Sequence, residues 1–233
     1  MTAEDPVPPE PARPTRGDQT RQKILETALE LFREKGYEET TMRAIAERAE
    51  VALGNTYYYF RSKEHLIQAF YGRTHEEHLE ACAALLAREK DLKKRLLGVM
   101  RTKLDASAPY HRFAGILFKS AADPMSPLNP FSPESSPVRQ ESTALFAAVL
   151  DGSKVKIPPD LRAELPNLLW LYHMGIILFW IHDESPGARR TQTLVEHSVD
   201  IVARLITLTS LPVLRPVRKR VLRLLDELRE KAA

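Results

Sequence analysis

The sequence contains very little cysteine and glycine. Of its 233 residues, one is a cysteine, Cys82, and nine are glycines. A single thiol excludes a disulfide within the chain, which favours a reducing compartment, and we expect a cytoplasmic protein. No basic segment followed by an apolar one begins the sequence, so we expect no export.

Long apolar runs are also missing. The longest run, residues 168–181, is interrupted by His173 and is shorter than the ~20 residues that a membrane-spanning helix needs. We therefore expect no membrane partner. Hydrophobic residues make up 43% of the chain and charged residues 28%, which is typical of a folded globular protein. The net charge of +3 is compatible with a nucleic-acid partner but does not by itself indicate one.

The prolines fall into clusters, and the sequence between them has helical periodicity. Of the 17 prolines, five lie in residues 6–14 and five in residues 124–137, which predicts a disordered arm and a long loop. No convincing alternating run bounded by turn residues predicts a strand. The sequence therefore predicts an all-α protein. The expected helices are 19–36, 41–48, 53–59, 62–87, 91–107, 109–121, 134–151, 160–183, 188–210 and 213–231.

The strongest functional signal lies in residues 40–66. Two helices of about two turns each are too short to be stable alone, so they must pack on one another and on the helix before them. Ile45, Ala49 and Val51 supply the apolar contacts of what we interpret as a helix-turn-helix. Three consecutive tyrosines, residues 57–59, cannot all point into a core. They suit a polar surface with flat apolar edges, such as a DNA groove.

This segment resembles the DNA-binding domain of the tetracycline repressor (TetR) family. The family's pattern is an amphipathic helix ending in Gly-Tyr, then Thr-Thr, Ile-Ala, a glycine before spaced aromatic residues, and a lysine three residues before a leucine. The matching residues are Gly36, Tyr37, Thr40, Thr41, Ile45, Ala46, Gly54, Tyr57, Tyr59, Phe60, Lys63 and Leu66. The resemblance implies an N-terminal three-helix helix-turn-helix domain and a C-terminal helical domain for ligand binding and dimerisation.

The resemblance also implies a set of DNA-contacting residues. Thr41 and Arg43 match positions at the start of the second helix that contact phosphate or base. Lys63 matches a phosphate-binding lysine at a helix N-terminus, where the helix dipole also favours an anion. The recognition helix would contribute Gly54, Asn55, Tyr57, Tyr58 and Tyr59.

Three positions depart from the family's pattern. Glu50 replaces the usual turn glycine, and a positive φ there would cost roughly 1 kcal/mol. Ala52 replaces a serine that would cap the recognition helix and donate to phosphate. Leu53 replaces a frequent basic residue and is limited to packing or to contact with a thymine methyl group.

The rest of the chain is predicted to sense a ligand and to dimerise. Helix 160–183 is apolar on all sides and helix 188–210 has a broad apolar stripe, so both need extensive burial. The resemblance implies that they form an intersubunit four-helix bundle in a homodimer; packing within one chain is the alternative. Candidate contacts to a mostly apolar effector, each with plain core packing as its alternative, are Leu104, Phe113, Leu117, Phe118, Trp170, His173, Met174 and Phe179.

Two further patterns invite a chemical interpretation. His75, His78 and Cys82 recur at helical spacing, which permits a metal site, but a solvated face is the favoured interpretation, and we expect neither metal nor cofactor. His182 and Asp183 are the only pair suggestive of acid–base catalysis, and neighbours on a helix do not face each other. We therefore expect no enzyme activity and no catalytic residues.

The predicted organisation has four segments. They are a disordered arm (1–17), a DNA-binding domain (18–62), a regulatory and dimerisation domain (63–210), and an amphipathic C-terminal helix (211–233) that packs on its own domain or on the partner. Arg13 and Arg16 are minor-groove candidates if the arm binds DNA. The predicted function is a repressor released from a palindromic double-stranded DNA operator by a small effector. A DNA-binding activator or architectural protein without such a switch is the alternative.

Overall fold

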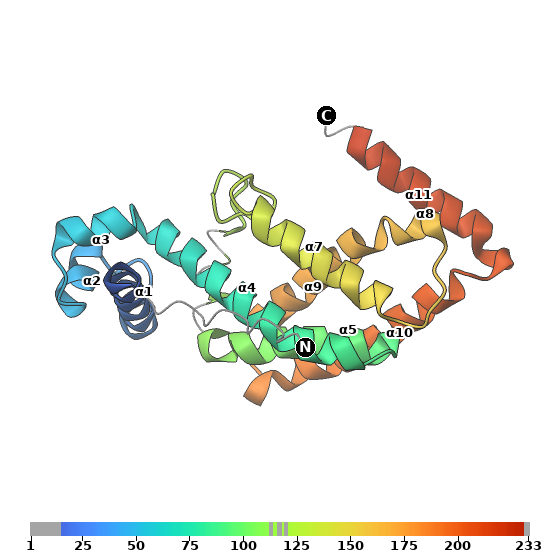
Figure 1. Ribbon diagram of the computed structural model, residues 1–233, viewed down its shortest axis with the longest axis horizontal. Helices are drawn as coiled ribbons and strands as arrows, with labels where there is room; N and C mark the ends of the chain where they lie inside the picture. Colours follow the sequence, from blue (N-terminus) through green and yellow to red (C-terminus); the bar gives the residue numbers. More distant parts are fainter. Residues whose placement is uncertain (1–14, 112–113, 116–117, 119–120, 231–233) are drawn as a thin grey trace, which may run out of the picture. The chain divides into compact units, whose positions relative to one another are not determined.

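The described part of the protein consists of helices arranged in two compact units. In the computed structural model the described residues are 15–111, 114, 115, 118 and 121–230. They divide between a first unit, residues 1–69, and a second unit, residues 70–233. Every regular element within these described stretches is a helix, which confirms the all-α prediction (Figure 1). The predicted arm up to Pro14 lies outside the described residues.

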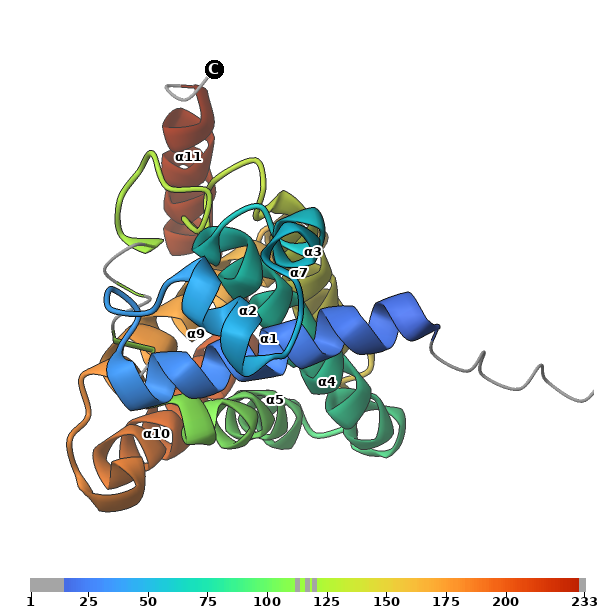
Figure 2. The same ribbon diagram turned by 90° about the vertical axis from the view of Figure 1, so that its left-hand side faces the viewer.

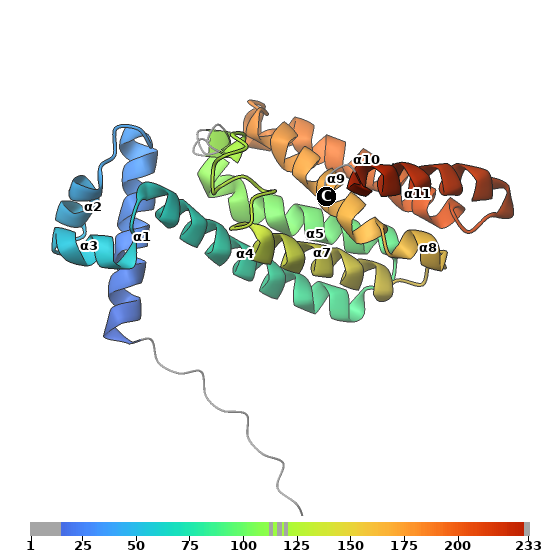
Figure 3. The ribbon, with the colours of Figure 1, turned by 90° about the horizontal axis from the view of Figure 1, so that it is seen from above.

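Unit 1 contains three helices and the start of a fourth. They are α1 (Arg16–Lys35), α2 (Met42–Arg48), α3 (Leu53–Tyr59) and the beginning of α4 (Lys63–Arg88). Helix α2 packs on α1, and α3 packs on α2 (Figures 2 and 3). The core that joins them is apolar and includes Ile24, Ala28, Phe32, Ile45, Ala49, Phe60 and Leu66. This core includes Ile45 and Ala49, two of the apolar contacts that the sequence predicted for the short helices.

Helix α1 begins earlier than the sequence periodicity predicts. The side chain of Thr15 accepts a hydrogen bond from the backbone N–H of Asp18, and the Asp18 carboxylate accepts one from the backbone N–H of Thr15. This reciprocal capping box satisfies two donors at the helix start. The expectation that Arg16 belongs to a disordered arm is therefore wrong, because Arg16 is the first residue of α1.

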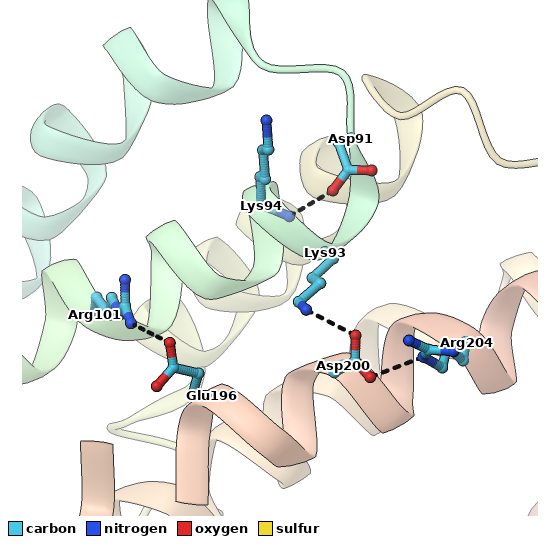
Figure 4. Close-up of polar contacts among 7 residues, drawn as sticks. All are labelled: Asp91, Lys93, Lys94, Arg101, Glu196, Asp200 and Arg204. Carbon is cyan, nitrogen blue, oxygen red and sulfur yellow. Dashed lines mark hydrogen bonds and ion pairs between the residues drawn. The ribbon is translucent and has the colours of Figure 1, made fainter. Parts of the chain in front are cut away.

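Unit 2 is built from the remainder of α4 and the helices that follow it. These are α5 (Leu92–Ser107), η1 (Ala108–Tyr110), α7 (Ser136–Asp151), α8 (Pro159–Arg162), α9 (Leu165–Ile181), η2 (Pro186–Ala188), α10 (Arg189–Leu208), η3 (Pro212–Leu214) and α11 (Arg215–Glu230). Helix α9 packs on α7 and α10, and α5 packs on α7 and α10 (Figure 3). Ion pairs reinforce the α5–α10 contact: Lys93 with Asp200 at 2.7 Å and Arg101 with Glu196 at 3.2 Å (Figure 4).

The predicted helix 160–183 is in fact two helices. Helix α8 ends at Arg162, and α9 starts at Leu165 with Pro166 in its first turn. A proline lacks the backbone N–H and clashes with the carbonyl four residues earlier, which here belongs to Arg162, so one continuous helix cannot form. The first turn of a new helix tolerates proline because its N–H groups have no partner there.

The buried Arg95 of α5 joins the ends of two other helices. Its guanidinium donates to the carbonyls of Leu86 and Glu89 at the end of α4 and to those of Ala148 and Val149 in the last turn of α7. The last carbonyls of a helix lack partners within the helix and carry partial negative charge, so a cation stabilises them. A β-carbon at Gly152 would lie 2.1 Å from this guanidinium, which is why the residue after α7 carries no side chain.

No single described helix is both long and apolar enough to cross a membrane. The pair of α10 and α11, each with its preceding 3-10 turn, passes a test of length and composition together, but the two helices are bent by 98°.

Candidate nucleic-acid interface and sensor interior

The turn between α2 and α3 holds Glu50 in the left-handed region. The N–H of Val51 bonds to the carbonyl of Ala46, and the N–H of Glu50 bonds to that of Glu47. This is the Schellman arrangement, which usually has glycine at its left-handed position. Glu50 occupies that position with φ of 54°, so the strain foreseen for a non-glycine residue is present. Its carboxylate is 3.2 Å from the ammonium of Lys23 on α1, so a neighbouring cation offsets its negative charge.

The start of α3 presents bare backbone rather than a side-chain cap. Ala52 makes no side-chain capping hydrogen bond, in agreement with the missing serine. Gly54 is exposed, and no atom lies within 4 Å of the place its β-carbon would occupy. The first turn of α3 is therefore open to close approach by another molecule, and a helix N-terminus favours an anion such as phosphate.

The side chains of α3 divide between the core and the surface. Thr56 is fully buried, which fixes the rotation of this short helix about its own axis. Asn55 is exposed as a consequence, and Tyr57 and Tyr58 are 48% and 81% exposed. Tyr59 is half-buried and makes an edge contact with Tyr58, with 5.1 Å between ring centroids. The exposed face therefore combines an amide with two phenol groups.

The remaining predicted DNA contacts lie at the starts of α2 and α4. Thr41 is the N-cap of α2, and its hydroxyl accepts from the N–H of Ala44 at 3.1 Å. Arg43, the second residue of the same helix, is exposed. The Lys63 ammonium donates to the carbonyl of Tyr37 at 2.7 Å and lies 4.3 Å from the centroid of that tyrosine's ring. Lys63 thus anchors the turn after α1, and its role at phosphate stays a prediction.

The structure places most of the predicted effector contacts in the core of unit 2. Leu104, Trp170 and His173 are buried, and Met174 packs against the same core from the adjacent position of α9. Phe118 and Phe179 are half-buried. Phe113 and Leu117 lie outside the described residues. The loop at 122–135 contributes Phe131, whose ring meets that of Trp170 edge-on with 5.4 Å between centroids.

The expectation of a solvated face for His75, His78 and Cys82 is wrong. All three side chains are buried in unit 2, where α4 packs beside its neighbours. The Nε2 of His78 donates to the carbonyl of Val99 on α5 at 3.0 Å, and the Nε2 of His75 is 3.1 Å from the Glu141 carboxylate on α7. Desolvation raises the pKa of the Cys82 thiol to about 11, so the thiol is protonated at neutral pH.

His173 of α9 completes a buried group of imidazoles. Its ring stacks on that of His78 with 6.3 Å between centroids, and it is tilted against Phe146 at 5.7 Å. Desolvation lowers the pKa of His173 to about 3 and that of His78 to about 4. Both rings are therefore neutral at physiological pH. Within the described part of the chain, neither ring nitrogen of His173 has a hydrogen-bond partner.

Lys103 is the residue of this interior that sequence reasoning missed. It lies on α5, is only partly exposed, and its positive charge lowers the pKa of His75, His78 and His173. Burial in turn lowers the pKa of Lys103 itself. A signal was present in the sequence, because His75, His78 and Cys82 continue the spacing of the apolar residues Ile67 and Phe70 along one face of α4.

Asp183 has a structural task between α9 and α10. It is buried, and its carboxylate accepts from the N–H and hydroxyl of Thr191 at 2.8 and 2.7 Å and from the N–H of Ser185 at 3.0 Å. These hydrogen bonds lower the pKa of Asp183 far below its usual range. The carboxylate thus fastens the start of α10 to the turn after α9.

Two family models match the chain. Unit 1 has the geometry of a helix-turn-helix domain, and the model described as "Bacterial regulatory proteins, tetR family" matches residues 24–70. The model described as "Tetracyclin repressor-like, C-terminal domain" matches residues 95–224, which is more than half of the chain. The protein belongs to the TetR family, a family of transcriptional regulators.

Individual relatives agree with this assignment. The transcriptional repressor KstR of Mycolicibacterium smegmatis is 48% identical over 56 residues, which is 24% of this chain and 28% of KstR. The match spans only about a quarter of the length of such curated relatives.

Solved structures show the same fold over a longer stretch. A TetR-family protein of Syntrophomonas wolfei has a TM-score of 0.63 at 20% identity, over 81% of this chain and 96% of that one. The repressor FadR of Thermus thermophilus, solved with lauroyl-CoA, has a TM-score of 0.56 at 20% identity, over 82% of this chain and 95% of FadR.

Proposed function

We propose that this protein is a DNA-binding transcriptional repressor whose operator affinity responds to a small effector. The observation that carries the DNA-binding part is the surface of α3, where Asn55, Tyr57 and Tyr58 face solvent beside the open backbone at Gly54. Amide and phenol groups donate to base edges and phosphates, and a seven-residue helix of this kind fits the major groove. Thr41, Arg43, Tyr59 and Lys63 complete the proposed contact set.

The repressor acts as a homodimer in this proposal. Helix α10 buries Val195, Val199 and Ile206 and leaves Ile201 and Leu205 each 58% exposed. With the half-buried Leu194 and the exposed Leu208, these residues lie at intervals of seven, four and three positions, which places them along one side of the helix. Such spacing is typical of a helix that packs against a second helix, and a second copy of this chain supplies one. Two copies place two recognition helices on successive major grooves of a palindromic site.

The effector binds inside unit 2 in this proposal. The unpartnered imidazole of His173 supports it, because a buried polar group without a partner is costly and is normally retained for a purpose. FadR of Thermus thermophilus, with a similar fold, was solved with lauroyl-CoA, so the fold accommodates an acyl ligand. A DNA-binding regulator without a switch would leave the orphaned imidazole unexplained.

No catalysis is part of the proposed function. His182 and Asp183 are the pair closest to an acid–base dyad, and Asp183 already uses its carboxylate to hold α10. We expect the protein to act on DNA in the cytoplasm.

The test is genome-wide footprinting with the purified protein, followed by binding measurements on the fragments recovered. We expect Tyr58→Ala to weaken binding to all sequences and Asn55→Ala to change the preferred base, by about 1–3 kcal/mol for each lost contact. Glu39→Ala, which removes an exposed side chain of unit 1 outside α2 and α3, serves as the control. Unchanged operator binding by both α3 variants would overturn the proposed interface.

A further inference from the structure

Helix α11 carries a line of apolar residues that faces solvent. Val217, Val221, Leu224 and Leu228 are 58%, 39%, 55% and 59% exposed. Their spacing of four, three and four positions places them along one side of the helix. The same spacing is that of the a and d positions of a helix that pairs with another helix in a coiled coil. The apolar line therefore has the form of a contact surface rather than of scattered exposed residues.

A different side of α11 holds the helix on unit 2. The Arg218 guanidinium is 3.0 Å from the Asp160 carboxylate of α8 and donates to the carbonyl of Thr209 at 3.1 Å. Leu222 packs against the core of unit 2, and Leu225 is half-buried. These contacts fix the rotation of α11 about its own axis, so the apolar line stays turned outwards.

The apolar line of α11 is separate from the exposed face of α10. The two helices, each with its preceding 3-10 turn, are bent by 98°. A straight partner helix that covers Ile201 and Leu205 on α10 cannot also lie along α11. A partner of α11 therefore makes a contact in addition to the one proposed above for the homodimer.

The charges of α11 are divided along its length. The first nine residues include five basic ones and no acidic one, and the acidic Asp226 and Glu227 follow further on. Arg220 and Glu227 come directly before two members of the apolar line, and both are exposed. Two such helices that ran in the same direction would bring their basic segments together. In opposite directions the basic segment of each helix lies beside the acidic residues of the other, and the helix dipoles also favour this arrangement.

We propose that α11 pairs antiparallel with α11 of a second copy of this chain. In the register that centres the pair, Val217 faces the partner's Leu228 and Arg220 faces the partner's Glu227, once on each side of the two-fold axis. The apolar line covers about two heptads, fewer than the three or four of a sustained coiled coil, so the contact is weaker than that of α10 and joins homodimers at higher concentration. The proposal does not depend on DNA binding or on an effector.

A lipid surface fits this side of α11 less well than a second copy does. Helices that lie on anionic membranes are rich in lysine and arginine on their polar face. On α11 the exposed Glu227 borders the apolar line and Asp226 is exposed beside it, so anionic headgroups would repel this end of the helix. A second copy instead offers both of them basic residues.

Disulfide trapping on the full chain tests the pairing. Val217→Cys and Leu228→Cys, combined in one chain, should give a covalent dimer on oxidation, whereas neither change alone should do so. In the antiparallel register the two positions face each other, but two copies of the same position lie about 16 Å apart, beyond the ~7 Å between Cα atoms that a disulfide allows. The two positions are equally far apart within one chain. The native Cys82 is buried and does not interfere.

Charge reversal tests the register independently, by sedimentation velocity over a range of protein concentrations. Arg220→Glu or Glu227→Arg alone turns two symmetry-related attractions into repulsions, so we expect about tenfold weaker association through α11. The two changes combined in one chain should restore it. Lys219→Glu is the matched control, because it changes the net charge as Arg220→Glu does, at an exposed residue away from the apolar line. Urea unfolding of each variant verifies that the fold is kept.

Several results would overturn the pairing. They are cross-linking of either single-cysteine variant, which indicates a parallel pair, no cross-linking of the combined variant, or charge reversals that do not compensate each other. Binding to phosphatidylglycerol vesicles that is lost in Leu224→Glu, without self-association, would assign the apolar line to a lipid surface instead. Failure of the proposed function is distinct, because it appears as unchanged operator binding in the α3 variants.

Discussion

Glu50 and Thr56 show how single residues shape the surface that we propose binds DNA. Thr56 is fully buried, and this places its neighbours Asn55, Tyr57 and Tyr58 outside. Glu50 closes the turn before α3 in a conformation that glycine adopts without strain. The sequence foresaw the tyrosine surface, since three adjacent phenol groups cannot share one core. The strain at Glu50 was predicted only through the resemblance to the TetR family, because a glutamate in a sequence does not by itself indicate a left-handed φ.

Replacing Glu50 with glycine should stabilise unit 1. The change removes left-handed strain of about 1–2 kcal/mol from the folded state. Glycine also gives the unfolded chain more conformational freedom, which offsets part of this gain, so the net increase in the free energy of unfolding is under about 1 kcal/mol. The ion pair lost with Lys23 is exposed and contributes little. Urea unfolding measures the effect, with Glu50→Ala as the control that removes the carboxylate but keeps the β-carbon. Equal stability of the glycine and alanine variants would contradict the strain.

Helix α10 has two apolar faces, and only one of them packs against other helices of the described part of the chain. Its inner face packs on α5 and α9, where Lys93 and Asp200 also meet (Figure 4). Its outer face carries Ile201 and Leu205 into solvent. Helix periodicity predicted one broad apolar stripe on this helix, because it needs only the spacing of apolar residues. It did not predict the break before α9, since Pro166 sits inside an otherwise apolar run.

Glutamate at both Ile201 and Leu205 should dissociate the proposed homodimer. The two side chains are exposed within one chain, so its fold tolerates the change, whereas a dimer would bury four carboxylates without partners at a cost of about 3–5 kcal/mol. Sedimentation equilibrium should show a monomer at concentrations at which the unmodified protein is a dimer, and operator affinity should fall with it. Met125→Glu, at a loop residue that is 89% exposed, is the matched control. A dimer that persists in the double variant would place the interface elsewhere.

At the scale of the whole molecule, unit 2 encloses two imidazoles, those of His78 and His173, that stay neutral when folded. His75 and His78 were expected on a solvated face, because histidine is polar and does not count as an apolar position of a helix. Their spacing continues the apolar face of α4, but the residues of α5 and α7 that they contact are distant in sequence and were not predictable from one helix. Lys103 was missed for the same reason. Three predicted effector contacts are described and buried: Leu104, Trp170 and His173. For Leu104 and Trp170, packing in the core and contact with an effector give the same sequence pattern.

Stability of unit 2 should fall in mild acid. The pKa of His78 is lowered to about 4 and that of His173 to about 3, against an ordinary value of 6.5, so the unfolded chain binds more protons than the folded one between these limits. Stability is complete above the unfolded pKa and is lost as the pH falls towards the folded values. Two such groups give a slope of about 2–3 kcal/mol per pH unit near pH 5.

Urea unfolding between about pH 7 and pH 5 measures this slope. His173→Leu should remove about half of it and raise stability at neutral pH, because an unpartnered imidazole is replaced by an apolar group. His65→Leu, at an exposed histidine of α4, should leave the slope unchanged. A stability that does not vary over this range would contradict neutral burial of the two rings.

The guanidinium of Arg95 ties three helices together at one point. It belongs to α5 and donates to carbonyls at the end of α4 and in the last turn of α7. Removing it would leave these helix-terminal carbonyls without their donor, so we expect a change at Arg95 to loosen the junction of all three helices.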